Sequence, residues 1–101
     1  MLNIGYTENG SEAKITLEGR LDANTSKDLK TKIGEIPESV LNADLNIADL
    51  EYTSSAGLRV ILQLHNQLHQ RGGKLVISKP NDTIAEVFED TGLSDCLNIV
   101  R

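Results

Sequence analysis

Aromatic residues are scarce in this chain: tryptophan is absent, and Tyr6, Tyr52 and Phe88 are the only aromatic side chains among 101 residues. Hydrophobic residues nevertheless make up 39% of the chain and charged residues 25%, which is typical of a globular domain. A chain of this length buries roughly 65% of the surface that its unfolded form exposes, enough for one core without disulfides or metals. We therefore expect a single domain with an aliphatic core, and the length excludes a multidomain, cofactor-rich enzyme.

Basic residues are also in the minority. Lys and Arg number 10 against 15 Asp and Glu, which gives a formal net charge of −5 at pH 7. Binding to nucleic acid or to an anionic membrane relies on clustered Lys and Arg. The nearest approach to a cluster is Lys27, Lys30 and Lys32, which spread over different helix faces and are offset by Asp28 and Glu35. We interpret them as a solvated helix face, and we expect neither nucleic acid nor membrane as a partner.

Cysteine is rare and long apolar runs are missing. The single cysteine, Cys96, has no intrachain partner, so nothing in the sequence points to an oxidising compartment. No signal peptide, transit peptide or apolar run of membrane-spanning length is recognisable. The expected location is therefore the cytoplasm.

The first half of the chain predicts a hairpin and a helix. Apolar residues alternate with polar ones over residues 2–6 and 13–17, on either side of the turn Asn9-Gly10. Thr25 and Asp28 have the spacing of a capping box at the start of a helix, which should run to about Glu35 and stop before Pro37.

The second half predicts alternating strands and helices. Ser54 or Ser55 is expected to cap the longest helix, which ends at Gly72-Gly73. The other expected elements are strands over residues 43–47, 74–78 and 96–100, a turn over 80–82, a short helix over 83–89 and a loop over 90–95. Cys96 is expected in the core at the head of the last strand.

The element order is thus β-β-α-β-α-β-α-β, which indicates an α/β fold with a mostly parallel sheet and one antiparallel hairpin strand. The strands over residues 13–17 and 43–47 each carry a polar face, so the helices should lie mainly on one side of the sheet. Loops that follow parallel strands meet at the carboxyl end of the sheet, where such folds place their sites. Here those loops are residues 19–24, 52–56 and 78–82.

Hydroxyl groups gather in the middle one of these loops. Thr53, Ser54 and Ser55 stand directly before a helix, and Asp22 lies in the neighbouring loop. One serine as helix cap and Asp22 as a turn residue favourable to the helix dipole would explain part of this pattern. A cap needs only one hydroxyl, however, and Ala56-Gly57 would leave the backbone uncovered, which favours a surface that a partner approaches closely.

Two segments resemble those of a known family. Gly19-Arg20-Leu21-Asp22-Ala23-Asn24-Thr25 is similar to a G-x-L-D-x-x-T segment, and Ser54-Ser55-Ala56-Gly57-Leu58 is similar to a D-S-S/T-G-L segment. Both belong to the bacterial anti-sigma factor antagonists, which consist of a STAS domain. The resemblance covers nearly the whole chain and implies one STAS-like domain over residues 1–101.

The resemblance implies a phosphorylation switch rather than an enzyme. In the family, the unphosphorylated protein binds an anti-sigma factor, a serine kinase with a histidine-kinase-like ATPase fold, and frees its sigma factor. Phosphorylation by that kinase ends binding, and a PP2C-type phosphatase reverses it. No cofactor is implied. The alternative is a STAS regulatory module for a different partner, in a signalling, secretion or transport complex.

The family's phosphoacceptor matches Ser55. Ser54 is the alternative acceptor, because it replaces the usual aspartate, and Ala56 replaces the following hydroxyl residue. The matching acidic residue of the partner-binding surface is Asp22. The full expected partner-binding set is Asp22, Asn24, Thr53, Ser54, Ala56, Gly57, Leu58 and Arg59.

Two other kinds of chemistry are disfavoured. His65 and His69 are four residues apart on one helix, but the spacing marks no third metal ligand, so we expect polar residues beside an apolar stripe and no metal site. A nucleophilic Ser55 lacks the glycine two residues earlier that a nucleophile elbow uses, and neither histidine lies in a carboxyl-end loop. We therefore expect no catalytic residues.

Overall fold

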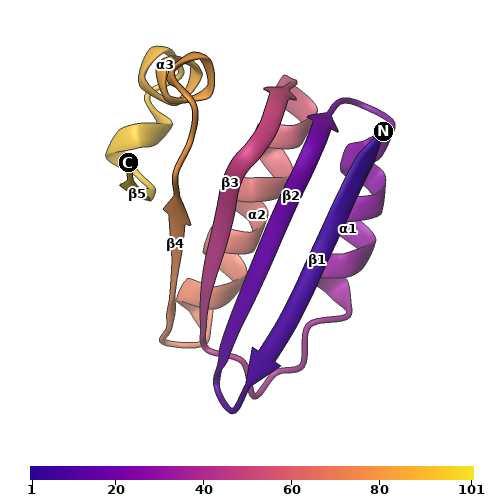
Figure 1. The fold of residues 1–101 in the computed structure, drawn as a ribbon. Coiled ribbons are helices and arrows are strands. Elements are labelled where there is room, and N and C mark those ends of the chain that lie inside the picture. Colours follow the sequence, from indigo (N-terminus) through magenta and orange to yellow (C-terminus); the bar gives the residue numbers. More distant parts are fainter.

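Five strands form one sheet whose spatial order, β1-β2-β3-β4-β5, is the order of the chain (Figure 1). The computed structural model describes residues 1–101. The strands are β1 (Leu2–Asn9), β2 (Glu12–Leu21), β3 (Asn42–Thr53), β4 (Lys74–Ser78) and β5 (Asn98–Val100). The helices are α1 (Thr25–Gly34), α2 (Ser55–Gln70), α3 (Asp82–Asp90) and a 3₁₀ turn, η1 (Leu93–Asp95). β1 is antiparallel to β2 and the other pairings are parallel, which confirms the predicted order and pairing.

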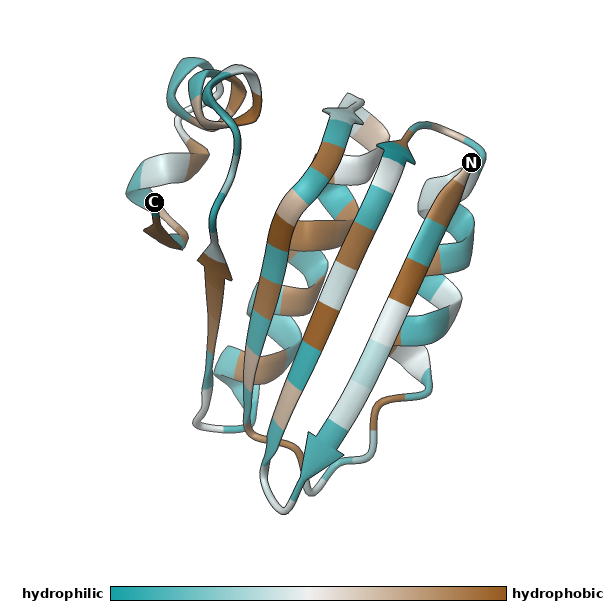
Figure 2. Ribbon diagram, viewed as in Figure 1, coloured by the Kyte–Doolittle hydropathy of each residue, from teal (hydrophilic) through white to brown (hydrophobic).

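The sheet has one covered face and one open face. Helices α1 and α2 lie behind the sheet in Figure 1, and α3 stands beyond the end of β4. Figure 2 shows the hydrophobic and hydrophilic bands that alternate along β2 and β3. In β2 the buried residues Ala13, Ile15 and Leu17 alternate with exposed Lys14 and Thr16. The prediction of helices mainly on one side is therefore confirmed.

The core is aliphatic, as the composition predicts. It contains 22 buried residues, and Phe88 on α3 is the only aromatic side chain among them. Both tyrosines lie outside this set: Tyr6 packs against it from β1, and Tyr52 is 40% exposed. Burial of aliphatic side chains from both layers is what holds the helices on the sheet.

Strand β3 is longer than alternation predicts. Its pairing with β2 steps from Thr16↔Asn46 to Glu18↔Asp49, and a second shift follows Gly19. Each shift puts an additional β3 residue opposite β2, which is the signature of a β-bulge. Beyond Ile47, the inward residues Leu50 and Thr53 therefore recur every third position. The alternating pattern ends at Ile47, so the predicted end of this strand was wrong.

The predicted position of Cys96 was also wrong. Gly92, at φ 78, turns the chain out of α3 into η1. The backbone N–H of Leu97 donates to Leu93 O at 2.9 Å, and Leu97 is buried while Cys96 is exposed. Strand β5 begins two residues later than expected, at Asn98.

Candidate functional site

The ends of β2 and β3 are tied together at the carboxyl edge of the sheet. Leu21 pairs with Thr53, and the Ser54 N–H donates to Leu21 O at 2.8 Å. The loop before α1 and the start of α2 therefore leave the sheet side by side (Figure 1). The structure thus brings Asp22 and the hydroxyl-rich loop into one region, as the topology predicts.

Asp22 is fixed by the start of α1. Its Oδ1 accepts hydrogen bonds from the backbone N–H groups of Asn24 at 3.0 Å and Thr25 at 2.9 Å, and lies 3.1 Å from Thr25 Oγ1. The bonds from Thr25, chiefly its backbone N–H, hold the pKa of Asp22 below its ordinary value and outweigh the effect of partial burial. No hydrogen bond engages Oδ2, so one carboxylate oxygen has no partner within the chain.

The capping box predicted for α1 was wrong. Asn24 occupies the N-cap position but makes no side-chain cap bond, and Asp28 takes no part in capping. Thr25 Oγ1 instead lies 2.8 Å from Arg20 O and accepts from the Asp22 N–H at 2.8 Å. Asp22, three residues before Thr25, caps the helix instead, because the chain turns back on itself between Arg20 and Thr25.

Ser54 and Ser55 have different roles at the start of α2. Ser54 is the N-cap: its backbone is extended, and its Oγ accepts from the Gly57 N–H at 3.2 Å. It is half-buried, whereas Ser55, the first helical residue, is exposed and its hydroxyl makes no hydrogen bond within the chain. The structure thus assigns the cap to Ser54 and leaves the Ser55 hydroxyl available for reaction.

Gly57 is buried rather than uncovered, which corrects the interpretation of Ala56-Gly57. A Cβ at this position would lie 2.6 Å from Leu21 Cγ and 2.8 Å from Thr53 Oγ1. The glycine therefore allows α2 to approach the end of β2 closely. Its role is packing, and the backbone here is not a contact surface.

The expected partner-binding residues divide by exposure. Thr53, Gly57 and Leu58 are buried, so they support the surface from below. Those that reach solvent are Asp22, Asn24, Ser54, Ala56 and Arg59, of which Asn24 and Arg59 are exposed. A partner would meet a small, polar surface formed by the two loops.

A cation–π pair at the same edge was not predicted. The Arg20 guanidinium carbon lies 4.4 Å from the centre of the Tyr52 ring. The two residues are register partners only because of the second shift between β2 and β3. No sequence signal would have paired them without knowledge of that bulge. The pair extends the exposed surface from the loops to the open face of the sheet.

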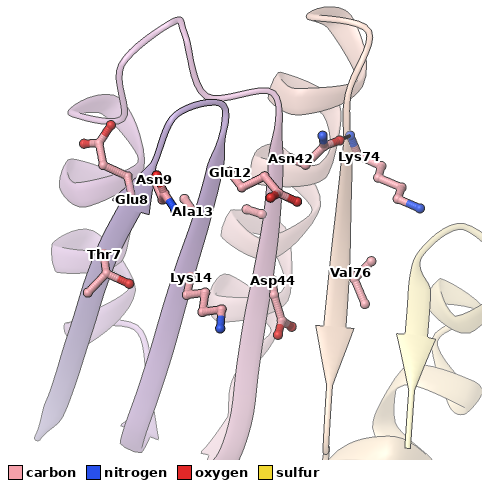
Figure 3. A pocket seen from close by; sticks show the side chains of 11 residues that line it. Thr7, Glu8, Asn9, Glu12, Ala13, Lys14, Asn42, Asp44, Lys74 and Val76 are labelled. Atoms are coloured by element: carbon pink, nitrogen blue, oxygen red, sulfur yellow. Dashed lines mark hydrogen bonds between the residues drawn. The ribbon is translucent and has the colours of Figure 1, made fainter.

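A hollow of about 610 Å³ lies at the other end of the open face (Figure 3). It is formed by the hairpin end of β1 and β2 and by the beginnings of β3 and β4. Its side chains mix both charges, with Glu12 and Asp44 beside Lys14 and Lys74. None of the predicted site residues lines it.

The two histidines of α2 stack on each other. The rings of His65 and His69 lie 6.0 Å apart with an angle of 15° between their planes. No cluster of three or more His, Cys, Asp or Glu side chains suited to a metal ion is present.

None of the helices has the length and apolar character that crossing a membrane would require.

Comparisons with known proteins point to one family. The family model of the STAS domain matches residues 3–101. The "Anti-sigma-B factor antagonist" of Bacillus subtilis is 26% identical over 100 residues, covering 97% of this chain and 90% of the relative. The protein of the same description from Listeria monocytogenes is 30% identical over 87 residues, covering 84% and 75%.

A solved structure shows the same fold. The Bacillus cell fate determinant SpoIIAA in the phosphorylated form superposes with a TM-score of 0.75 at 20% identity, over 100% of this chain and 92% of that chain. The sequence and structural matches together confirm the resemblance found in the two sequence segments. The chain belongs to the STAS-domain family of anti-sigma factor antagonists.

Proposed function

We propose that this chain is a regulatory binding protein switched by phosphorylation of Ser55. Unphosphorylated, it binds an anti-sigma factor that is a serine kinase of the histidine-kinase-like ATPase fold, and the bound anti-sigma factor releases its sigma factor in the cytoplasm. Phosphorylation of Ser55 ends this binding, and a PP2C-type phosphatase restores it. The observation that carries the proposal is the exposed, unpartnered Ser55 hydroxyl on the loop next to that of Asp22, in a chain of this family.

Accessibility favours Ser55 over Ser54 as the acceptor. A kinase must bring the γ-phosphate of ATP to the attacking oxygen, and the Ser55 hydroxyl reaches solvent without breaking any bond. The Ser54 Oγ is half-buried and caps α2 through the Gly57 N–H, so its phosphorylation would cost the helix its cap. Transfer to Ser55 Oγ forms the phosphate ester and releases ADP and the hydroxyl proton.

A phosphate at Ser55 changes the surface and leaves the fold intact. It adds roughly −1.5 to −2 charges at pH 7, and the first turn of a helix tolerates negative charge because of its dipole. SpoIIAA, which shares the fold, is known in a phosphorylated form. In this chain the phosphate would join the Asp22 carboxylate in one anionic patch. Like charges brought together at an interface cost several kcal/mol, which suffices for release of a partner.

The test is a quantitative pull-down from lysate of the native host, with Ser55→Ala and Ser55→Asp as paired baits. The proposal predicts that a small kinase of the ATPase fold is enriched on the alanine bait and at least roughly tenfold depleted on the aspartate bait, equivalent to about 1.4 kcal/mol. The recovered kinase, incubated with ATP and the wild-type chain, should phosphorylate Ser55, as read by mass spectrometry.

Ser54→Asp supplies the matched control. Aspartate is as good an N-cap as serine and removes the Ser54 hydroxyl, so phosphorylation of this variant should persist. Equal recovery of the same proteins on both baits, or phosphate found on Ser54 alone, would contradict the proposal.

A further inference from the structure

The start of α2 carries a positive charge where helices usually carry a negative one. Arg59 is exposed and lies one turn after Ser55, and the first turn contains no acidic residue. The only ion pair of the chain joins Arg101 to Asp82, so Arg59 has no carboxylate partner. The helix dipole favours an anion at the first residue of α2, and an anion there would give Arg59 a partner of opposite charge.

The helix places Arg59 and Ser55 on the same face, one turn apart. Residues four apart share a helix face, with Cβ atoms about 5–6 Å apart. The Cα–Cβ bonds of a helix tilt toward its N-terminus, so the long side chain of Arg59 is able to extend back over the turn that Ser55 begins. Its neighbours Leu58 and Val60 are buried, which fixes this face of α2 outward.

We propose that Arg59 is the internal counter-charge of phosphorylated Ser55, its guanidinium donating hydrogen bonds to the phosphate oxygens. This inference rests on the proposed phosphorylation of Ser55. Guanidinium and phosphate form charge-assisted pairs that are frequently bidentate, which a lysine ammonium cannot match. The pair forms only after modification, because the serine hydroxyl carries no charge to hold Arg59.

The pairing gives phosphorylation a second effect on the partner surface. In the unmodified chain Arg59 is free to contact a partner at the rim of the site. After phosphorylation the phosphate holds it on its own helix. One modification therefore adds an anion to the surface and withdraws a cation from it. A partner that uses both features would lose two contacts at once.

The experiment uses phosphoserine placed at residue 55 during synthesis by codon reassignment, so that no kinase is needed. The ³¹P NMR signal of the phosphate is followed against pH through its second ionisation, near pH 6. Removing a nearby cation disfavours the dianion, so Arg59→Gln should move the titration midpoint up by about 0.3 pH unit. Arg59→Lys should recover part of this difference, and 1 M salt should shrink it.

Two further variants make the result specific. Lys14→Gln also removes one positive charge, but Lys14 lies at the far end of the sheet. The phosphate of this variant should therefore titrate with the same midpoint as that of the wild type. Arg20→Gln removes the other arginine near the site. Equal midpoints for Arg59→Gln and Lys14→Gln, or a rise for Arg20→Gln alone, would overturn the pairing. Neither result would contradict the proposed function, because the pull-down tests that function separately.

Discussion

At the scale of single residues, Gly57 shows how tightly the site is packed. Its missing side chain lets α2 approach Leu21 and Thr53, where a Cβ would meet carbon at 2.6 Å and oxygen at 2.8 Å. We expect Gly57→Ala to lower the free energy of unfolding by about 1–3 kcal/mol, as overpacking does. Urea denaturation measures this.

Gly34 provides the matched control. It is also helical, but a Cβ there would have no atom within 4 Å. Gly34→Ala should therefore be neutral or stabilise by up to about 1 kcal/mol through the helix propensity of alanine. Equal losses in the two variants would mean that the packing at Gly57 is not the cause.

Ser54 and Ser55 should also differ in their effect on stability. Ser54→Ala removes the cap bond to the Gly57 N–H and should cost about 1 kcal/mol, whereas Ser54→Asp should keep the stability of the wild type. Ser55→Ala removes no bond and should change the melting temperature little. Thermal unfolding of the three variants, read by circular dichroism, measures this. A larger loss for Ser55→Ala than for Ser54→Ala would contradict the assignment of the cap.

At the scale of elements, the start of α1 should make stability depend on acid pH. Hydrogen bonds from Thr25 lower the pKa of Asp22 in the folded chain, so the unfolded chain binds this proton more readily. The resulting stability is fully present above the unfolded pKa of Asp, about 3.9, and is lost as pH falls through the lower folded value.

Asp22→Asn tests this dependence, because asparagine keeps the acceptor oxygen but does not titrate. The urea midpoint of this variant should fall less steeply than that of the wild type below about pH 4. Asp28→Asn, in the first turn of the same helix but outside the cap, should change this slope less than Asp22→Asn does. Parallel acid slopes for Asp22→Asn and the wild type would contradict the role of the Asp22 carboxylate.

Elements were predictable from sequence where one periodicity persisted. The apolar stripe that ends at Gly72-Gly73 predicted α2, and Asn9-Gly10 predicted the hairpin. The prediction failed where tertiary structure altered the pattern. Bulges in β3 replaced alternation by a repeat of three, and Gly92 turned Cys96 away from the core.

For the site, the topology predicted that the loops of Asp22 and Ser55 meet. Only the structure distinguishes Ser54, which caps the helix, from Ser55, whose hydroxyl is free.

At the scale of the whole molecule, one core joins every layer, so unfolding should be cooperative. Phe88 is fully buried and connects α3 to the aliphatic side chains under the sheet. Phe88→Ala should therefore cost about 3–5 kcal/mol, a large share of the 5–15 kcal/mol typical of such a domain. Far-UV circular dichroism and tyrosine fluorescence should give one common midpoint for the wild type and for this variant. Separate midpoints would show that the α3 region unfolds on its own.

The Arg20–Tyr52 pair also places a fluorescent side chain, Tyr52, at the edge of the proposed site. Tyr52 is exposed and lies three residues before Ser55, and no indole is present to absorb the light that a tyrosine emits. A partner docking on this edge would change the surroundings of one of only two phenol rings. Excitation at a wavelength that tryptophan absorbs and tyrosine does not would, by contrast, excite any indole of a partner and no side chain of this protein. The proposed capture and release of a partner on this edge would thus be observable by intrinsic fluorescence, without attaching a dye to either protein.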